Sequence, residues 1–244
     1  MVIHARGFTL TELMVAMTLS LGVAAGALHL FGIGLNAWRT VEAAASLEER
    51  LNFALQAIET DLLLAGYRGE SHLAGPQEPA SASCRGRDVS LWALAIDRPF
   101  AAYNNPTALP CPSYAGMATN SDALVVRHHD AMSETLIVQT HGWYIDRESS
   151  LPEQPSLRRH TLLPNGSVQN QEIIPGIETL QVTLGVDRDG DNLVDDFVEP
   201  GGVSDPVLMV RIEIRARAAV RENGIGGDGF RRITAQRTVF LRNA

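Results

Sequence analysis

The hydrophobic positions of the chain begin with one long apolar segment. Residues 13–38 form an uncharged run of 26 residues that is bounded by Glu12 and Arg39. At about 1.5 Å per residue, a helix of this length reaches about 39 Å. A bilayer core requires about 20 apolar residues, so the run predicts a membrane-spanning helix.

From about residue 39 to residue 65 the pattern becomes amphipathic. Apolar residues recur at three- and four-residue steps, which is the helical period, and acidic or amide residues take the other faces. Gly66 and Gly69 end the pattern. We therefore predict one continuous helix over residues 8–66, whose second half packs on a sheet. The apolar positions of that half are Leu47, Leu51, Ala54, Leu55, Ile58 and Leu62.

The rest of the chain consists of short strand-like runs between turns. Residues 208–215 alternate between apolar and polar side chains, which is typical of a half-buried antiparallel strand. No strand–helix–strand alternation is present in the sequence. We therefore predict an α+β fold, with the long N-terminal helix packed on an antiparallel β-rich domain over residues 67–244. The predicted strands are 89–96, 123–127, 135–139, 143–146, 157–163, 177–186, 208–215 and 231–241; the predicted loops are 70–88 and 97–121.

Composition fits a single anchored domain. Hydrophobic residues make up 45% of the 244 residues, which suits a globular domain with one anchor and not a polytopic membrane protein. The net charge is −8. An acidic chain binds nucleic acid poorly, so we expect no nucleic-acid partner.

Two features at the start of the apolar run are unusual for an ordinary membrane helix. Glu12 places a carboxylate near membrane depth, where it costs about 2.5–3.5 kcal/mol and generally has a function. A short basic leader precedes the run, with Arg6 beside Gly7. Two simpler interpretations stay open: a secretory signal peptide cut near residues 25–27, and a plain anchor with Glu12 at the interface. The first fits poorly, because the apolar region of a signal peptide is about 7–15 residues long.

The segment Gly7-Phe8-Thr9-Leu10-Thr11-Glu12 resembles the N-terminal signal of type IV pilins and pseudopilins. The resemblance implies that a prepilin peptidase removes residues 1–7 by cutting after Gly7 and methylates the new N-terminal Phe8. It also implies that residues 8–38 are kept as a transmembrane and assembly segment, and that Glu12 acts in filament assembly.

Three further segments resemble the PilW-type minor pilins of type IV pilus systems. They are residues 65–69, 177–191 and 230–243. The resemblance implies a structural subunit, not an enzyme, that helps to initiate or cap pilus assembly. Two alternatives stay open. One is a minor pseudopilin of a type II secretion system, which shares the signal and the fold. The other is an adhesive or ligand-binding module at a pilus tip, with binding in residues 70–121.

The resemblance also implies a location and partners. With Arg6 in the cytoplasm, the positive-inside rule places the C-terminal domain in the periplasm behind a single span of the inner membrane. The subunit then enters a pilus, at its tip or base. The expected partners are prepilin peptidase, other minor pilins, the major pilin and a large pilus-tip protein.

Cys84 and Cys111 are the two cysteines, and each lies in a predicted loop. The periplasm permits disulfides, so the simplest expectation is that they pair with each other. The alternative is two free buried thiols.

An acidic run between two predicted strands has the spacing of a calcium loop. Such a loop takes side chains at positions one, three, five and nine and a backbone carbonyl at position seven. Asn192 stands at the turn position and tolerates a left-handed conformation, whereas the twelfth position is Val198, with Glu199 one residue later. We expect Ca²⁺ here, because crowded carboxylates are costly without a cation; the alternative is a solvated acidic turn. The expected ligands are Asp187, Asp189, Asp191, Leu193 and Asp195.

Two other patterns do not predict chemistry. Gly224, Gly226 and Gly229 match a dinucleotide fingerprint by letter, but they lie between two strands and open no helix, so we expect a hairpin loop. His128 and His129 are neighbours in a predicted strand and point to opposite faces, so they cannot easily share a metal. None of the common hydrolase or metalloprotease motifs occurs in the sequence, and we expect no enzyme.

Overall fold

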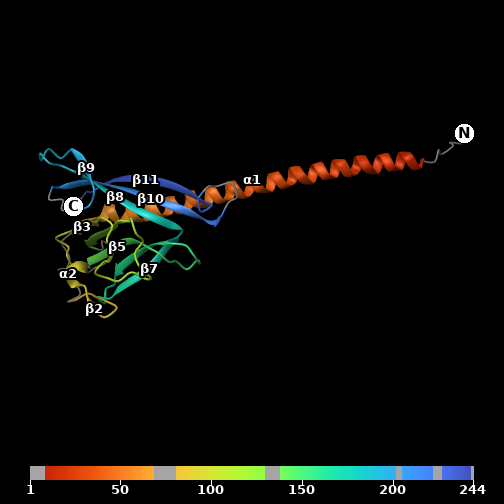
Figure 1. The fold of residues 1–244 in the computed structure, drawn as a ribbon. Helices are drawn as coiled ribbons and strands as arrows, with labels where there is room; N and C mark the ends of the chain where they lie inside the picture. Colours follow the sequence, from red (N-terminus) through yellow and green to blue (C-terminus); the bar gives the residue numbers. More distant parts are fainter. Residues whose placement is uncertain (1–8, 69–80, 130–137, 202–204, 222–226, 243–244) are drawn as a thin grey trace, which may run out of the picture. The chain divides into compact units, whose positions relative to one another are not determined.

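A computed structural model describes residues 9–68, 81–129, 138–201, 205–221 and 227–242. Helix α1 (Leu10–Leu64) is continuous over 55 residues. The chain divides into two compact units, Met1–Ser46 and Leu47–Ala244. The division lies inside α1, so the second half of the helix belongs to the globular unit instead of preceding it. The expected α+β fold is confirmed (Figure 1).

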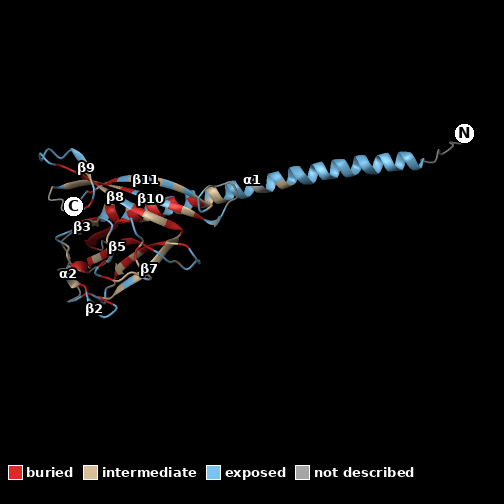
Figure 2. Ribbon diagram, viewed as in Figure 1, coloured by how far each residue is buried: buried red, intermediate tan, exposed pale blue. Residues whose placement is uncertain are grey.

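The first unit contains the apolar part of α1. Most of its described residues are exposed (Figure 2), including Leu28, Phe31 and Trp38. Among the described residues, α1 is the one helix long and apolar enough to cross a membrane, and none of its most apolar window is buried. This agrees with the predicted membrane span.

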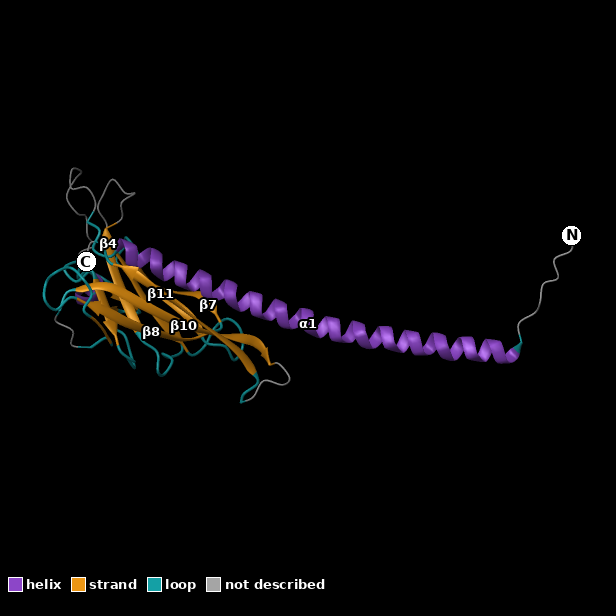
Figure 3. Cartoon of the chain, turned by 90° about the horizontal axis from the view of Figure 1, so that it is seen from above, coloured by secondary structure: helices purple, strands orange, loops and turns teal. Residues whose placement is uncertain are grey.

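The globular unit contains two larger antiparallel sheets and a small hairpin (Figures 1 and 3). The five-stranded sheet has the order β3-β4-β5-β6-β7, the four-stranded sheet has the order β11-β10-β8-β9, and β1 pairs with β2. Each strand of the five-stranded sheet pairs with the next strand in the sequence. The bounds are β1 Ser83–Cys84, β2 Arg87–Asp88, β3 Phe100–Tyr103, β4 Ala123–His129, β5 Val138–Asp146, β6 Ser156–Leu162, β7 Val168–Pro175, β8 Ile177–Val186, β9 Asp196–Val198, β10 Val207–Arg221 and β11 Phe230–Phe240.

The main core forms where the second half of α1 meets both sheets. The predicted apolar stripe of α1 is buried throughout, from Leu47 to Leu62. It packs with inward-facing residues of β4, β5 and β6 and with those of β8 and β10. Gly66 ends the helix in a left-handed conformation (φ 74°), and its N–H donates to the carbonyl of Arg127 at 3.0 Å. A glycine in the left-handed conformation commonly ends a helix.

The predicted strand over residues 89–96 is wrong. Residues Ser90–Ala93 form the short helix α2. Asp88 Oδ1 accepts the backbone N–H of Ser90 at 2.9 Å, and such a local bond competes with an extended backbone. Trp92 is buried, whereas Leu91 is 97% exposed. A continuous apolar run carries no periodicity that separates a strand from a helical turn.

Strand β5 joins two strands that were predicted separately and continues through Gly142. It contains residues 143–146 and the described part of residues 135–139. A Cβ atom at Gly142 would lie 3.0 Å from Trp92 Cζ2. Glycine therefore suits the close approach of Trp92 at this point of the sheet and does not mark a turn. The short strands β3 and β9 and the polar strand β7 lie in segments where no strand was predicted.

Candidate functional site

Glu12 lies in the first turn of α1 and closes the end of the helix. Its Oε2 atom accepts the backbone N–H of Thr9 at 3.0 Å and the Thr9 hydroxyl at 2.9 Å. The backbone N–H of Glu12 donates to Thr9 Oγ1 at 3.3 Å. This reciprocal pair is a capping box. The signal for it is the Thr-x-x-Glu spacing, which the sequence interpretation did not use. Gly7 and Phe8, the expected cleavage and methylation residues, lie outside the described residues.

Farther along α1, glycines leave gaps between the larger apolar side chains of the helix surface. Cβ atoms added at Gly22, Gly26 or Gly34 would meet nothing within 4 Å. A shallow apolar groove surrounds Gly34 and is lined by Ala27, Leu30, Phe31, Gly34, Leu35 and Trp38. In a membrane, close helix packing favours such positions.

Asp61 joins the last turns of α1 to the five-stranded sheet. It is 5% exposed, and its Oδ2 atom accepts the indole N–H of Trp143 at 2.8 Å. His141 Nδ1 lies 2.8 Å from the same oxygen, and Arg159 Nη1 lies 4.0 Å away. A buried carboxylate is costly unless it is paired in this way. Asp61 follows Ile58 by three residues and Ala54 by seven, so the helical period places it on the apolar stripe, a signal that the sequence prediction did not use.

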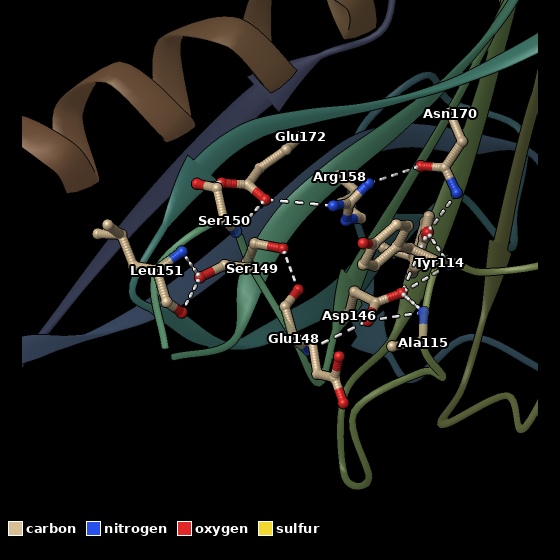
Figure 4. A network of polar contacts seen from close by, with 12 residues as sticks. Tyr114, Ala115, Asp146, Glu148, Ser149, Ser150, Leu151, Arg158, Asn170 and Glu172 are labelled. Carbon is tan, nitrogen blue, oxygen red and sulfur yellow. Dashed lines mark hydrogen bonds and ion pairs between the residues drawn. The ribbon is translucent and has the colours of Figure 1, made fainter. Parts of the chain in front are cut away.

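Asp146 holds the segment that was predicted as a loop around residue 111. The Asp146 carboxylate accepts the backbone N–H groups of Tyr114 at 2.8 Å and Ala115 at 3.1 Å (Figure 4). It also accepts the N–H of Glu148 at 3.1 Å. The loop is thus fixed to the end of β5 by a fully buried side chain, although it contains little regular structure.

A second set of contacts continues from this point along the sheet. Arg158 lies over the Tyr114 ring at 4.2 Å and pairs with Glu172 at 3.2 Å. Glu172 also accepts the N–H of Ser150 at 2.8 Å (Figure 4). These residues come from β6, β7 and two connecting segments. The network joins β6 and β7 to the segments that contain Tyr114 and Ser150, so we interpret it as structural.

Burial changes the titration of two stacked rings beside this network. Tyr144 and His160 lie with their ring centroids 4.9 Å apart. Burial raises the pKa of Tyr144 to about 12. Burial also lowers the pKa of His160 to about 4, because a charged imidazole loses its hydration there. His160 Nε2 lies 3.2 Å from the carbonyl oxygen of Pro112, so the neutral ring donates from that nitrogen.

Cys84 and Cys111 are joined by a disulfide in the structure, with their Cα atoms 5.5 Å apart. Both residues are buried. They belong to a second apolar cluster that includes Trp92 and Val125. The cross-link therefore fixes β1 and the segment around Cys111 over one face of the five-stranded sheet.

The acidic run forms the turn between β8 and β9. Oxygen atoms of Asp187, Asp189 and Asp195 lie within 4.8 Å of one another. Asp187 is 3% exposed, and its two oxygens accept the N–H groups of Gly190 at 2.7 Å and Asn192 at 2.9 Å. Asn192 has a φ of 63°, the left-handed conformation expected at this position. The grouped carboxylates have the hard oxygen atoms that Ca²⁺ prefers.

The structure does not bring all the expected ligands together. Asp191 lies outside the group, and its Oδ1 atom accepts the N–H of Leu193 at 2.8 Å. Leu193 is 66% exposed. Glu199 accepts an N–H of Asn104 at 3.0 Å. The flanking elements are strands, as expected for a turn that is not an EF-hand.

The remaining sequence patterns show no further site in the part of the chain that the structure describes. Gly229 lies in the turn before β11 with a φ of 80°, whereas Gly224 and Gly226 are outside the described residues. His128 and His129 are both buried on β4. The His128 ring meets that of His141 edge to face, with centroids 5.7 Å apart.

Two family models match this chain. Residues 4–28 match the prokaryotic N-terminal methylation motif, and residues 142–226 match the type IV pilus-assembly protein W model. The first match ends within the apolar part of α1. The second begins within β5 and ends five residues after β10. No curated protein and no solved structure matches the chain.

Proposed function

We propose that this chain, which is a PilW-like protein of the type IV pilin superfamily, helps to initiate or cap the assembly of a type IV pilus. The chain is a type IV pilus-related minor pilin. The observation that carries the proposal is the occurrence of both matches on one chain, with an uninterrupted helix from Leu10 to Leu64. Pilin-type proteins are structural subunits, and we propose no enzymatic activity.

The methylation motif and the apolar helix fit a membrane-anchored pilin. We infer that prepilin peptidase cuts after Gly7 and methylates Phe8, so that residues 8–38 remain as the anchor. The positive-inside rule then orients the globular unit toward the periplasm. The proposed partners are the other minor pilins, the major pilin and a large tip protein.

Glu12 has two roles in this proposal. Within its own chain it caps α1 through Thr9. Between chains, its charge pairs with the N-terminal ammonium of a neighbouring subunit. The attraction of opposite charges is much stronger in low dielectric than in water, so this pair helps to set the register between two subunits.

We also propose that the turn between β8 and β9 binds Ca²⁺. The support is the group of oxygens from Asp187, Asp189 and Asp195 and the left-handed turn at Asn192. The cation would neutralise the crowded carboxylates and stabilise this end of the four-stranded sheet.

The experiment that tests the proposed function is deletion of the gene in the native cell, with plasmid complementation. Surface pili should fall and return with the wild-type chain. Secretion of type II substrates should stay normal, because those substrates use a different filament. Normal piliation with lost secretion would instead assign the chain to a type II system as a minor pseudopilin.

A further inference from the structure

The outer face of the four-stranded sheet carries an arginine without an acidic partner. Arg211 lies on β10 between Val210 and Ile212, which are both fully buried. Because successive side chains of a strand point to opposite faces, Arg211 points away from the core, where it is half-buried. No carboxylate in the described part of the chain pairs with it. Other arginines of this sheet do have such partners: Arg215, Arg217 and Arg232 share Glu178, and Arg237 pairs with Glu59.

Arg211 is held in place by an aromatic ring. Its guanidinium carbon lies 3.8 Å from the centre of the Phe197 ring, and Phe197 is opposite Gly185 on the neighbouring strands. A Cβ atom at Gly185 would lie 3.2 Å from Phe197 Cε1, so the glycine leaves room for the ring against the sheet. The Nε atom of Arg211 is buried without a hydrogen-bond partner. A guanidinium stacked on a ring is pre-organised, and its planar fork matches the geometry of a carboxylate.

The polar neighbours of Arg211 favour a carboxylate from outside the chain. Thr183 and Thr238 lie directly opposite Arg211 on β8 and β11, and their hydroxyl groups can donate hydrogen bonds. Glu213 follows two residues later on the same face and is exposed, but it forms no ion pair with Arg211 among the described residues. The arginine and the two hydroxyls therefore make a group of donors that no acid of this chain fills.

The adjacent row of side chains is apolar and indicates a protein as the occupant. Met209 and Phe240 lie directly opposite each other. Phe240 is 48% exposed, and Met209 is partly exposed. Aromatic residues, methionine and arginine are enriched at the centre of protein–protein interfaces, where a few of them supply most of the binding energy. A small anion would fill the place beside Arg211 but leave this row uncovered.

We propose that the outer face of the four-stranded sheet around Arg211 is a docking site for another pilus protein, which places the carboxylate of an aspartate or glutamate on the Arg211 guanidinium. The inference rests on the proposed function for its choice of partner. Paired nitrogen–oxygen contacts between arginine and a carboxylate give geometric specificity as well as affinity. Because Phe197 already fixes the guanidinium, docking costs less side-chain freedom than it would for a mobile arginine.

The test uses the full chain, purified from native membranes in detergent with the pilus proteins that accompany it, and the same chain purified alone. Both samples are treated with phenylglyoxal, which modifies accessible guanidinium groups, and the modified peptides are measured by mass spectrometry. Arg211 should react at least about ten-fold more slowly in the complex, because the centre of an interface excludes solvent. Arg87, which is exposed on β2, is the internal control and should react equally in both samples.

Substitutions separate recognition of a carboxylate from a structural effect. Arg211→Gln should bind the partner at least about ten-fold more weakly, because it leaves the partner's carboxylate without its opposite charge. The matched control is Arg215→Gln on the same strand, which should bind normally because Arg215 already pairs with Glu178. Equal melting temperatures of the two variants show that both fold. Equal loss of binding in the two variants would overturn the proposal.

Glu213→Gln distinguishes another pilus protein from a second copy of this chain. The variant should bind normally if the carboxylate comes from another protein. A complex that contains only copies of this chain, and that both Arg211→Gln and Glu213→Gln weaken, overturns the proposed partner.

Two further outcomes separate the docking site from the proposed function. If pilus proteins accompany the chain while Arg211 reacts as fast as in the chain alone, the docking site is overturned and the proposed function stands. If no pilus protein accompanies the wild-type chain, the proposed partners fail, and the docking site fails with them.

Discussion

Asp187 gives the acidic turn its shape, because its buried carboxylate accepts two backbone N–H groups. The exposed Asp189 and Asp195 complete the group of oxygens. The spacing of the aspartates predicted this place and the left-handed Asn192. It did not predict that Asp191 would lie outside the group. The local backbone decides whether this carboxylate points toward the other oxygens or accepts the N–H of Leu193, two residues later.

The calcium proposal gives a first prediction. Calcium should raise the melting temperature of the full chain, because a ligand that binds the folded state stabilises it. The double variant Asp189→Asn, Asp195→Asn should lose that rise, since it removes two charges from the group. The matched variant Asp191→Asn should keep it. Scanning calorimetry with calcium or with chelator is the measurement, and an equal rise in both variants would contradict the site.

His160 gives a second prediction, on pH. Its folded pKa of about 4 is below the ordinary value of about 6.5. Between these values the unfolded state binds more protons, so stability rises with pH across this window and is lost as pH falls. His160→Gln should reduce the dependence of the free energy of unfolding on pH by up to about 1.4 kcal/mol per pH unit. Denaturant unfolding of the wild type and the variant at pH 4.5, 5.5 and 7 is the measurement, and an equal pH dependence in both chains would contradict the prediction.

At the scale of elements, α1 and the strands were largely predictable, and their attachments were not. The apolar stripe of α1 and the span of β8 follow the sequence closely because each has a clear period. The strand error at residues 89–96 came from an apolar run without a period. The partners of Asp61 and Asp146, which fix α1 and the loop around residue 111, could not be predicted because they are distant in sequence.

Asp61 gives a prediction about the attachment of α1. Asp61→Ala leaves the buried Trp143 N–H without its acceptor and removes the carboxylate beside His141 Nδ1, which should cost about 1–3 kcal/mol. The partly exposed pair of Glu59 with Arg237 provides the control, and Glu59→Ala should cost at most about 1 kcal/mol. The measurement is the free energy of unfolding of the full chain in detergent. Equal costs would mean that Asp61 does not anchor the helix.

The disulfide gives a further prediction at this scale. Without reductant, neither Cys84 nor Cys111 should react with a thiol reagent in the unfolded chain, because they are joined. Replacing both by serine should lower the free energy of unfolding by about 3.5 kcal/mol, the chain-entropy value for a loop of this size. Two labelled thiols per chain would refute the pairing.

At the scale of the whole molecule, an apolar helix that is long enough to cross a membrane continues into a β-rich globular unit, as in the proposed membrane-anchored subunit. The matches to the methylation motif and to the pilus-assembly protein support this order of parts. The sequence predicted both parts, since signal and anchor are contiguous in the chain. It could not predict the outer face around Arg211, because strand order depends on how distant segments pair.

The measurement that tests the central claim most directly compares two variants of Glu12. Glu12→Gln keeps the capping box with Thr9 but removes the charge, whereas Glu12→Val removes both. Each variant should insert and be cut after Gly7, with Phe8 methylated, which intact mass establishes. Each should nevertheless fail to join the other minor subunits, and pili should fall to the number found in the deletion strain. If Glu12→Gln is processed normally and restores full piliation, the charge of Glu12 does not act in assembly and the account is contradicted.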